Sequence, residues 1–161
     1  ISGSLGPAFA GKDREARYNM SLGSLMGGIV LNNAGAGVIH ALAYPIGAEY
    51  HLSHGKALMP IFSESLREIA VSNFPKLKNI GLAMGLKIEH LSPLPAADAA
   101  IDGMVQLANR VKLPTTLSDI KADKSKVQEW AQAAHGEQRL LGNTPVKLTL
   151  DDVAKIFERS F

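Results

Sequence analysis

Three of the five histidines in this 161-residue chain lie within fifteen residues of one another, beside a glycine-rich segment. His40 and Tyr44 are four positions apart, so a helix would present both on the same face. Pro45 and Gly47 would then let the chain turn back and bring His54 near His40. Two neutral imidazoles that converge from separate backbone segments can bind a divalent metal. Spacing alone leaves a second interpretation open, in which these histidines cap a helix end or lie in water.

Helical spacing bounded by glycine and proline recurs along the chain, whereas strand patterns are nearly absent. We therefore predict an all-α fold, a single domain of about six to eight helices. The predicted helices cover residues 12–32, 38–43, 61–70, 75–84, 95–111, 124–135 and 149–160. An irregular link is expected between Pro45 and Gly55. The last helix has Thr149 as its predicted N-cap and Asp152 three positions on, a variant of the capping box.

The predicted helix over 12–32 combines an apolar stripe with many small residues. The stripe consists of Tyr18, Leu22, Leu25, Met26 and Ile29. Glycine and serine lower helix propensity, so we expect another backbone to pack closely against this helix. Its most hydrophobic part, residues 22–30, is too short to span a bilayer.

The composition excludes several classes of protein. A chain with 46% hydrophobic residues and a net charge of +2 is expected to collapse into a core rather than stay disordered. The basic and acidic residues are too evenly balanced for a nucleic-acid binder. No cysteine is present, so any metal must bind to His, Asp or Glu. The lack of cysteine is compatible with a reducing compartment, and we expect a cytoplasmic location without a membrane partner.

A longer run of residues resembles a known family. The segment Asn33-Ala-Gly-Ala-Gly-Val-Ile-His40-Ala-Leu-Ala-Tyr44-Pro-Ile-Gly, with His54-Gly55 fourteen residues after His40, resembles the metal-binding signature of the iron-containing (group III) alcohol dehydrogenases. The resemblance extends from Lys12 to Pro60 and continues in Pro114-Thr-Thr-Leu and in Asn143-Thr-Pro-Val-Lys-Leu. It therefore covers nearly the whole chain.

This resemblance implies an enzyme built from two parts. In the family, an N-terminal α/β domain binds NAD or NADP, and a C-terminal helical domain, shared with dehydroquinate synthase-like enzymes, carries a divalent metal. We find no glycine-rich phosphate loop here, so residues 1–161 are expected to be the helical metal-binding domain, with the nucleotide-binding domain absent from this chain. His40 and His54 correspond to two of the four metal ligands, and an aspartate and a histidine would lie upstream of Ile1.

The implied reaction is reversible hydride transfer between an alcohol and its aldehyde or ketone, with iron or zinc as the metal. Many family members have a histidine near the nicotinamide at the position of Tyr44, so we expect Tyr44 at the cofactor site. His51 is the candidate proton relay, and Glu49 is a candidate acceptor for the other ring nitrogen of a metal-binding histidine. Ser53 replaces the usual proline, and the loop after His54 is shorter than in the family.

Two classes of function remain open from the sequence, and within the first a relative with zinc, of the glycerol dehydrogenase or dehydroquinate synthase type, is a further alternative. The first is the metal-binding half of an alcohol dehydrogenase that is inactive as an isolated chain. The alternative is a helical remnant that has lost catalysis and serves as a packing or oligomerisation module. Uncovered apolar surface would favour a homodimer. The coding sequence upstream of Ile1 would distinguish the two, because only the enzyme requires a nucleotide-binding loop and an Asp-x-x-x-His pair there.

Overall fold

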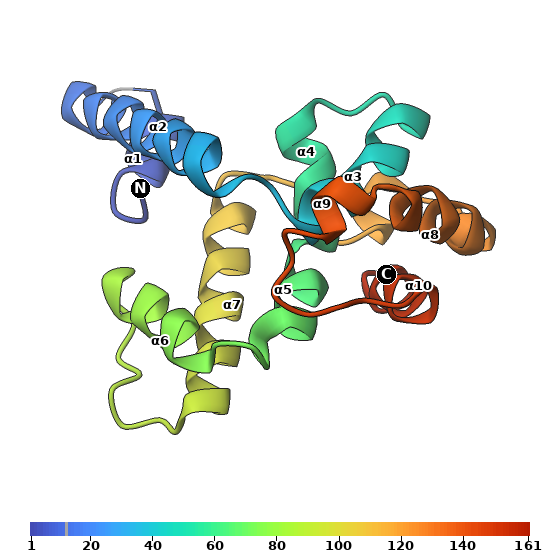
Figure 1. Ribbon diagram of the computed structural model, residues 1–161. Coiled ribbons are helices and arrows are strands. Elements are labelled where there is room, and N and C mark those ends of the chain that lie inside the picture. Colours follow the sequence, from blue (N-terminus) through green and yellow to red (C-terminus); the bar gives the residue numbers. More distant parts are fainter. Residues whose placement is uncertain (12) are drawn as a thin grey trace.

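The computed structural model describes residues 1–11 and 13–161, which form helices and loops without a strand (Figure 1). The longer helices are α2 (Arg14–Ala34), α3 (Val38–Glu49), α5 (Phe62–Ala70), α6 (Phe74–Ala83), α7 (Pro93–Arg110), α8 (Val127–Gly136) and α10 (Leu150–Arg159). The shorter ones are α1 (Leu5–Phe9), α4 (His54–Leu58), α9 (Gln138–Leu141) and the 3-10 turns Met59–Ile61, Ser118–Ile120 and Lys124–Lys126. The all-α prediction is confirmed. Lys12, where the first predicted helix starts, lies outside the described residues.

The central helix of the main core is α3. Ala41, Leu42 and Ile46 of this helix have no exposed surface, and they belong to one buried cluster with Trp130 of α8 and Phe157 of α10. The rings of Trp130 and Phe157 lie 5.8 Å apart between their centroids. Burial of this apolar surface is the main stabilising contribution. This burial also fixes the orientation of α3, and therefore the direction in which the polar residues on its opposite side point.

The boundaries of α3 differ from the prediction, because the helix continues through Pro45 to Glu49 instead of ending at 43. Proline removes one helical hydrogen bond, and the burial of α3 on either side of Pro45 offsets this cost. The chain reverses only after the helix, where His51 adopts a φ of 50°. A Cβ at Gly47 would lie 3.3 Å from the Cβ of Ala57, so glycine lets α4 pack close to α3.

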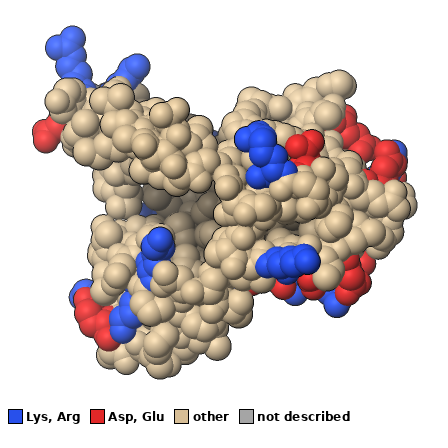
Figure 2. Space-filling view, in the orientation of Figure 1, with Lys and Arg blue, Asp and Glu red and all other residues tan. Residues whose placement is uncertain are grey.

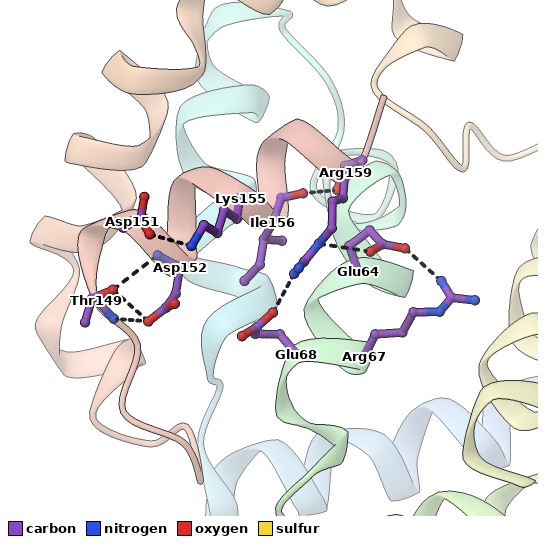
Figure 3. Close-up of polar contacts among 10 residues, drawn as sticks. Glu64, Arg67, Glu68, Thr149, Asp151, Asp152, Lys155, Ile156 and Arg159 are labelled. Carbon is purple, nitrogen blue, oxygen red and sulfur yellow. Dashed lines mark hydrogen bonds and ion pairs between the residues drawn. The ribbon is translucent and has the colours of Figure 1, made fainter. Parts of the chain in front are cut away.

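Ion pairs fix α10 to α5 (Figure 3). The guanidinium of Arg159 on α10 lies 3.3 Å from the carboxylate of Glu64 and also pairs with Glu68, both on α5. Glu64 also accepts a hydrogen bond of 2.8 Å from Arg67. These contacts hold α5 against the core, next to α3.

The N-terminus of α10 has the predicted capping box (Figure 3). The hydroxyl of Thr149 accepts a hydrogen bond from the backbone N–H of Asp152, and the Asp152 carboxylate accepts one from the backbone N–H of Thr149. Val153, Ile156 and Phe157 then face the core. The cap therefore starts the helix in the register that buries its apolar side.

The surroundings of α2 differ from the prediction, because only Ala16 of this helix is buried. The stripe residues are 41–69% exposed, and the close backbone packing expected against the small residues is confined, among the described residues, to α1 and Ile1. Within the described residues, none of the individual helices combines the length and the hydropathy that a membrane-spanning helix needs. α2 and α3 reach that length and hydropathy only when taken together, and the chain bends by 108° between them.

Candidate metal centre

The imidazole rings of His40 and His54 lie with their centroids 5.2 Å apart and their planes tilted by 45°. His40 is the third residue of α3 and His54 is the first residue of α4. The reversal after α3 therefore brings together two rings that are separated by fourteen positions. This proximity agrees with the expectation from sequence, although the turn that produces it lies after Glu49 and not at Pro45.

The environment of His40 favours its neutral form. Burial lowers the pKa of this half-buried imidazole, and the charge of the neighbouring His54 lowers it further. A histidine must be deprotonated to bind a metal, so the lowered pKa keeps its ring nitrogen available near neutral pH.

His40 also lines a pocket of about 260 Å³. The glycine-rich bend of residues 35–37 forms one wall, and Ile69 of α5 and residues 143–145 complete it. His54 does not line this pocket, so the pocket adjoins only one of the two histidine residues. Sequence reasoning missed Ile69, because nothing in its local pattern indicates which helix faces the bend.

Asn143 ties the two sides of this pocket together. Its Nδ2 donates a hydrogen bond of 3.2 Å to the carbonyl oxygen of Ala36. A Cβ at Gly35 would collide with this amide, and a Cβ at Gly37 would lie 3.4 Å from Oγ1 of Thr144. Gly35 therefore permits the close approach of the loop, whereas a Cβ at Gly37 would make an ordinary van der Waals contact. The resemblance around Asn143 was recognised in the sequence, but its contact with the bend was not.

The other predicted site residues are distributed around this centre. Tyr44 lies one turn after His40 on α3 and is 43% exposed. His51 is exposed in the turn between α3 and α4. The prediction for Glu49 is wrong: its carboxylate turns toward α8, where it accepts a hydrogen bond of 2.6 Å from Nε1 of Trp130 and lies 3.7 Å from Nζ of Lys126.

The two imidazoles alone do not make a complete metal site. Among residues 1–11 and 13–161, no group of three or more His, Asp or Glu residues is placed to hold a metal ion. The pair nevertheless fits two corners of one, since imidazoles bound to a single tetrahedral ion at about 2.0–2.1 Å place their ring centroids about 5 Å apart. A complete site would need further ligands besides these two imidazoles.

Residues 4–161 match the family model of the C-terminal part of the Fe-containing alcohol dehydrogenases. The chain belongs to this family. Two solved structures of similar fold are a 1,3-propanediol oxidoreductase, with a TM-score of 0.93 and 30% identity, and an alcohol dehydrogenase from Oenococcus oeni, with a TM-score of 0.93 and 27% identity. Each comparison covers 99% of this chain and 42% of the solved one. The predicted resemblance to the helical half of these enzymes is confirmed.

Curated members of the iron-containing alcohol dehydrogenase family are similar along most or all of the chain. Lactaldehyde reductase from Escherichia coli is 32% identical over 161 residues, and long-chain-alcohol dehydrogenase 1 from Geobacillus thermodenitrificans is 31% identical over 162 residues. The 1,3-propanediol dehydrogenase from Klebsiella pneumoniae is 31% identical over 94% of the chain. This chain spans 42%, 41% and 39% of these three proteins, respectively.

Proposed function

We propose that this chain is the helical metal-binding domain of a longer NAD(P)-dependent alcohol dehydrogenase. The enzyme would catalyse reversible hydride transfer between an alcohol and its aldehyde or ketone, in the cytoplasm. The observation that carries the proposal is the approach of the His40 and His54 rings to a centroid distance of 5.2 Å, in a chain of the iron-containing alcohol dehydrogenase family. The remaining ligands and the nucleotide-binding domain would precede Ile1.

His40 and His54 would hold a divalent cation, iron or zinc, through one ring nitrogen each. Such a cation supplies Lewis-acid stabilisation of the negative charge that develops on the alcohol oxygen as the hydride leaves. The depressed pKa of His40 supports this role, because a neutral ring binds a cation without first releasing a proton. The pocket beside His40 would admit the alcohol, and Ile69 gives it an apolar wall.

Tyr44 and His51 would act next to this centre. Tyr44 projects one helical turn beyond His40 and is exposed, so its ring is free to contact the nicotinamide. His51 is exposed in the turn that precedes His54, where it would pass the alcohol proton to solvent. Both roles come from the family resemblance together with these positions.

The test is to express the full coding region and to measure its metal content and NAD(P)-dependent oxidation of 1,3-propanediol and butanol. We expect one divalent metal per chain and measurable turnover. His40→Ala and His54→Ala should each lose the metal and lower kcat/KM by more than about 100-fold. His90→Ala is the matched control, because this exposed histidine lies outside the pocket.

Full metal occupancy and turnover in both variants would contradict the proposal. The isolated 161-residue chain should be inactive with every alcohol, because two ligands bind a cation weakly and no glycine-rich nucleotide loop is present. Substantial turnover by the isolated chain would also contradict it.

A second candidate function is favoured by the exposed apolar side of α2. A chain that has lost catalysis could use this surface for association and form a homodimer. A full-length protein without dehydrogenase activity, together with a dimer of the 161-residue chain, would support this candidate.

A further inference from the structure

The apolar side of α2 is unpartnered among the described residues. We call Tyr18, Leu22, Leu25, Met26 and Ile29 the α2 face. These side chains are 41–69% exposed, and Figure 2 shows charged side chains only near the N-terminal end of this helix. The sequence has no charged residue from 18 to 34.

Other sides of α2 are apolar too. Val30 and Leu31 are 62% and 52% exposed. Among the described residues, and apart from the neighbouring backbone of α2 itself, no heavy atom lies within 4 Å of the position that a Cβ would take at Gly27 or Gly28. A helix that is apolar around most of its circumference is normally buried. The missing side chains at 27 and 28 would also let another backbone approach closely. The helix therefore has the composition of an internal element.

An apolar hollow adjoins this helix. A pocket of about 530 Å³ lies between α1, α6 and α7, and the surface is visibly hollowed below α2 (Figure 2). Its lining includes Met59, Phe62, Met84, Met104 and Leu107. α1 connects the two features, because it packs against α2 and its Leu5 lines the hollow.

The chain enters the described structure between the α2 face and the hollow. A Cβ at Gly23 of α2 would lie 2.7 Å from Cγ1 of Ile1, so this side chain rests on the helix backbone. Ile1 also lines the hollow. Any polypeptide that precedes Ile1 would therefore emerge next to both apolar surfaces.

A preceding segment is a better occupant than a second copy. The 21 residues of α2 are about 31 Å long and about 10 Å wide, so one side of the helix covers about 310 Å². This area is well below the roughly 800 Å² that each partner buries in a stable interface. A covalently attached segment does not lose the translational freedom that association costs. The iron-containing alcohol dehydrogenases that are similar to this chain are more than twice as long as it. This chain matches the C-terminal part of the family.

We propose that an apolar segment of the same polypeptide, located before Ile1 in the sequence, packs on the α2 face and in the hollow. The proposal rests on the proposed function only in requiring a longer protein. The segment would cover both surfaces and pack its backbone against Gly27 and Gly28. α2 would then be an internal helix of the complete protein.

Thiol labelling provides the test, because the described chain has no cysteine. Leu25→Cys and Ile29→Cys place single thiols on the α2 face, and Gln132→Cys places one on the exposed side of α8 as the matched control. Maleimide labelling rates are compared in the 161-residue chain and in the full-length protein from the same gene, after replacement of any cysteine upstream of Ile1. We expect the two α2 thiols to react at least about 100-fold more slowly in the full-length protein, and the control to react equally fast in both.

Equal rates at α2 in the two proteins would overturn the proposal, as would a gene that encodes nothing before Ile1. Protection in the 161-residue chain that increases with its concentration would also overturn it, in favour of a second copy. Alcohol oxidation measured on the same full-length sample separates the two proposals. Protected α2 thiols in an inactive protein would support the packing of a preceding segment on the α2 face and would contradict the dehydrogenase function.

Discussion

Asn143 donates a hydrogen bond from its side-chain amide to the carbonyl oxygen of Ala36, across 3.2 Å and 107 positions of sequence. This bond joins the loop after α9 to the bend that leads into α3. His40 lies four residues after Ala36 and lines the same pocket, so the bond holds the bend from which α3 begins. The bend depends on Gly35. Its φ of 73° and ψ of −175° define a backbone conformation that only glycine adopts readily.

Gly35→Ala should therefore destabilise the chain by about 1–3 kcal/mol from backbone strain, with a further cost from collision with Asn143. Gly11→Ala is the matched control, because Gly11 has a φ of 85° but open space around its Cα, and it should cost about 1 kcal/mol. Urea unfolding measures both. If Gly35→Ala costs no more than Gly11→Ala, the contact with Asn143 does not constrain the bend.

Ser65→Ala should leave stability unchanged or raise it by about 1 kcal/mol. Its Oγ is fully buried in α5 and, among the described residues, has no hydrogen-bond partner. Ser160→Ala is the control: this buried hydroxyl donates to the carbonyl oxygen of Ile156 at 2.7 Å, so its removal should cost about 1 kcal/mol. Thermal unfolding of both variants tests the difference. A marked loss in Ser65→Ala would reveal a partner for its hydroxyl.

Thr149→Ala should cost about 1 kcal/mol, because it removes the side-chain half of the α10 capping box. Ser92 occupies the N-cap of α7 without a side-chain cap hydrogen bond, so Ser92→Ala should cost less. Denaturant midpoints of the two variants provide the comparison. Equal losses of stability in the two variants would mean that the hydrogen bonds of the capping box add no stability beyond that of a Ser or Thr at the N-cap.

Acid should destabilise the fold through His40. Its pKa is lowered from 6.5 in the folded state, so between that lowered value and 6.5 the unfolded state binds more protons. The full contribution to stability is present above about pH 6.5 and is lost as the pH falls through this window. His40→Gln should flatten this part of the stability profile, and His54→Gln should flatten it in part. An unchanged slope in His40→Gln would show that other groups cause the loss.

The fold class was predictable because helical spacing and capping are local. Thr149 with Asp152 three positions on marked the start of α10, because a cap is made by residues that are close in sequence. Pro45 misled the prediction, since the burial of α3 is a tertiary property that its own residues do not reveal. Glu49 was misassigned for the same reason, because only the fold brings Trp130 within 2.6 Å of its carboxylate.

The proximity of two histidines was predictable where spacing and family motif coincide. His40 and His54 stand at the positions of the signature, and the fold brings their rings together. Ile69 could not be found, because its place in the pocket depends on how α5 packs against the bend. The exposure of α2 was unexpected for a related reason. The pattern of small residues indicated that another backbone packs closely against this helix, but a local pattern does not identify the segment that does so.

A double-mutant cycle of divalent-metal affinity, with His40→Ala, His54→Ala and the double variant of the full-length protein, tests most directly whether the two rings share one ion. If they do, each single variant should lose most of the affinity and the double variant hardly more, with a coupling energy above about 1 kcal/mol. Losses that add within about 0.5 kcal/mol would show that the two histidines act independently, and the metal centre would be contradicted.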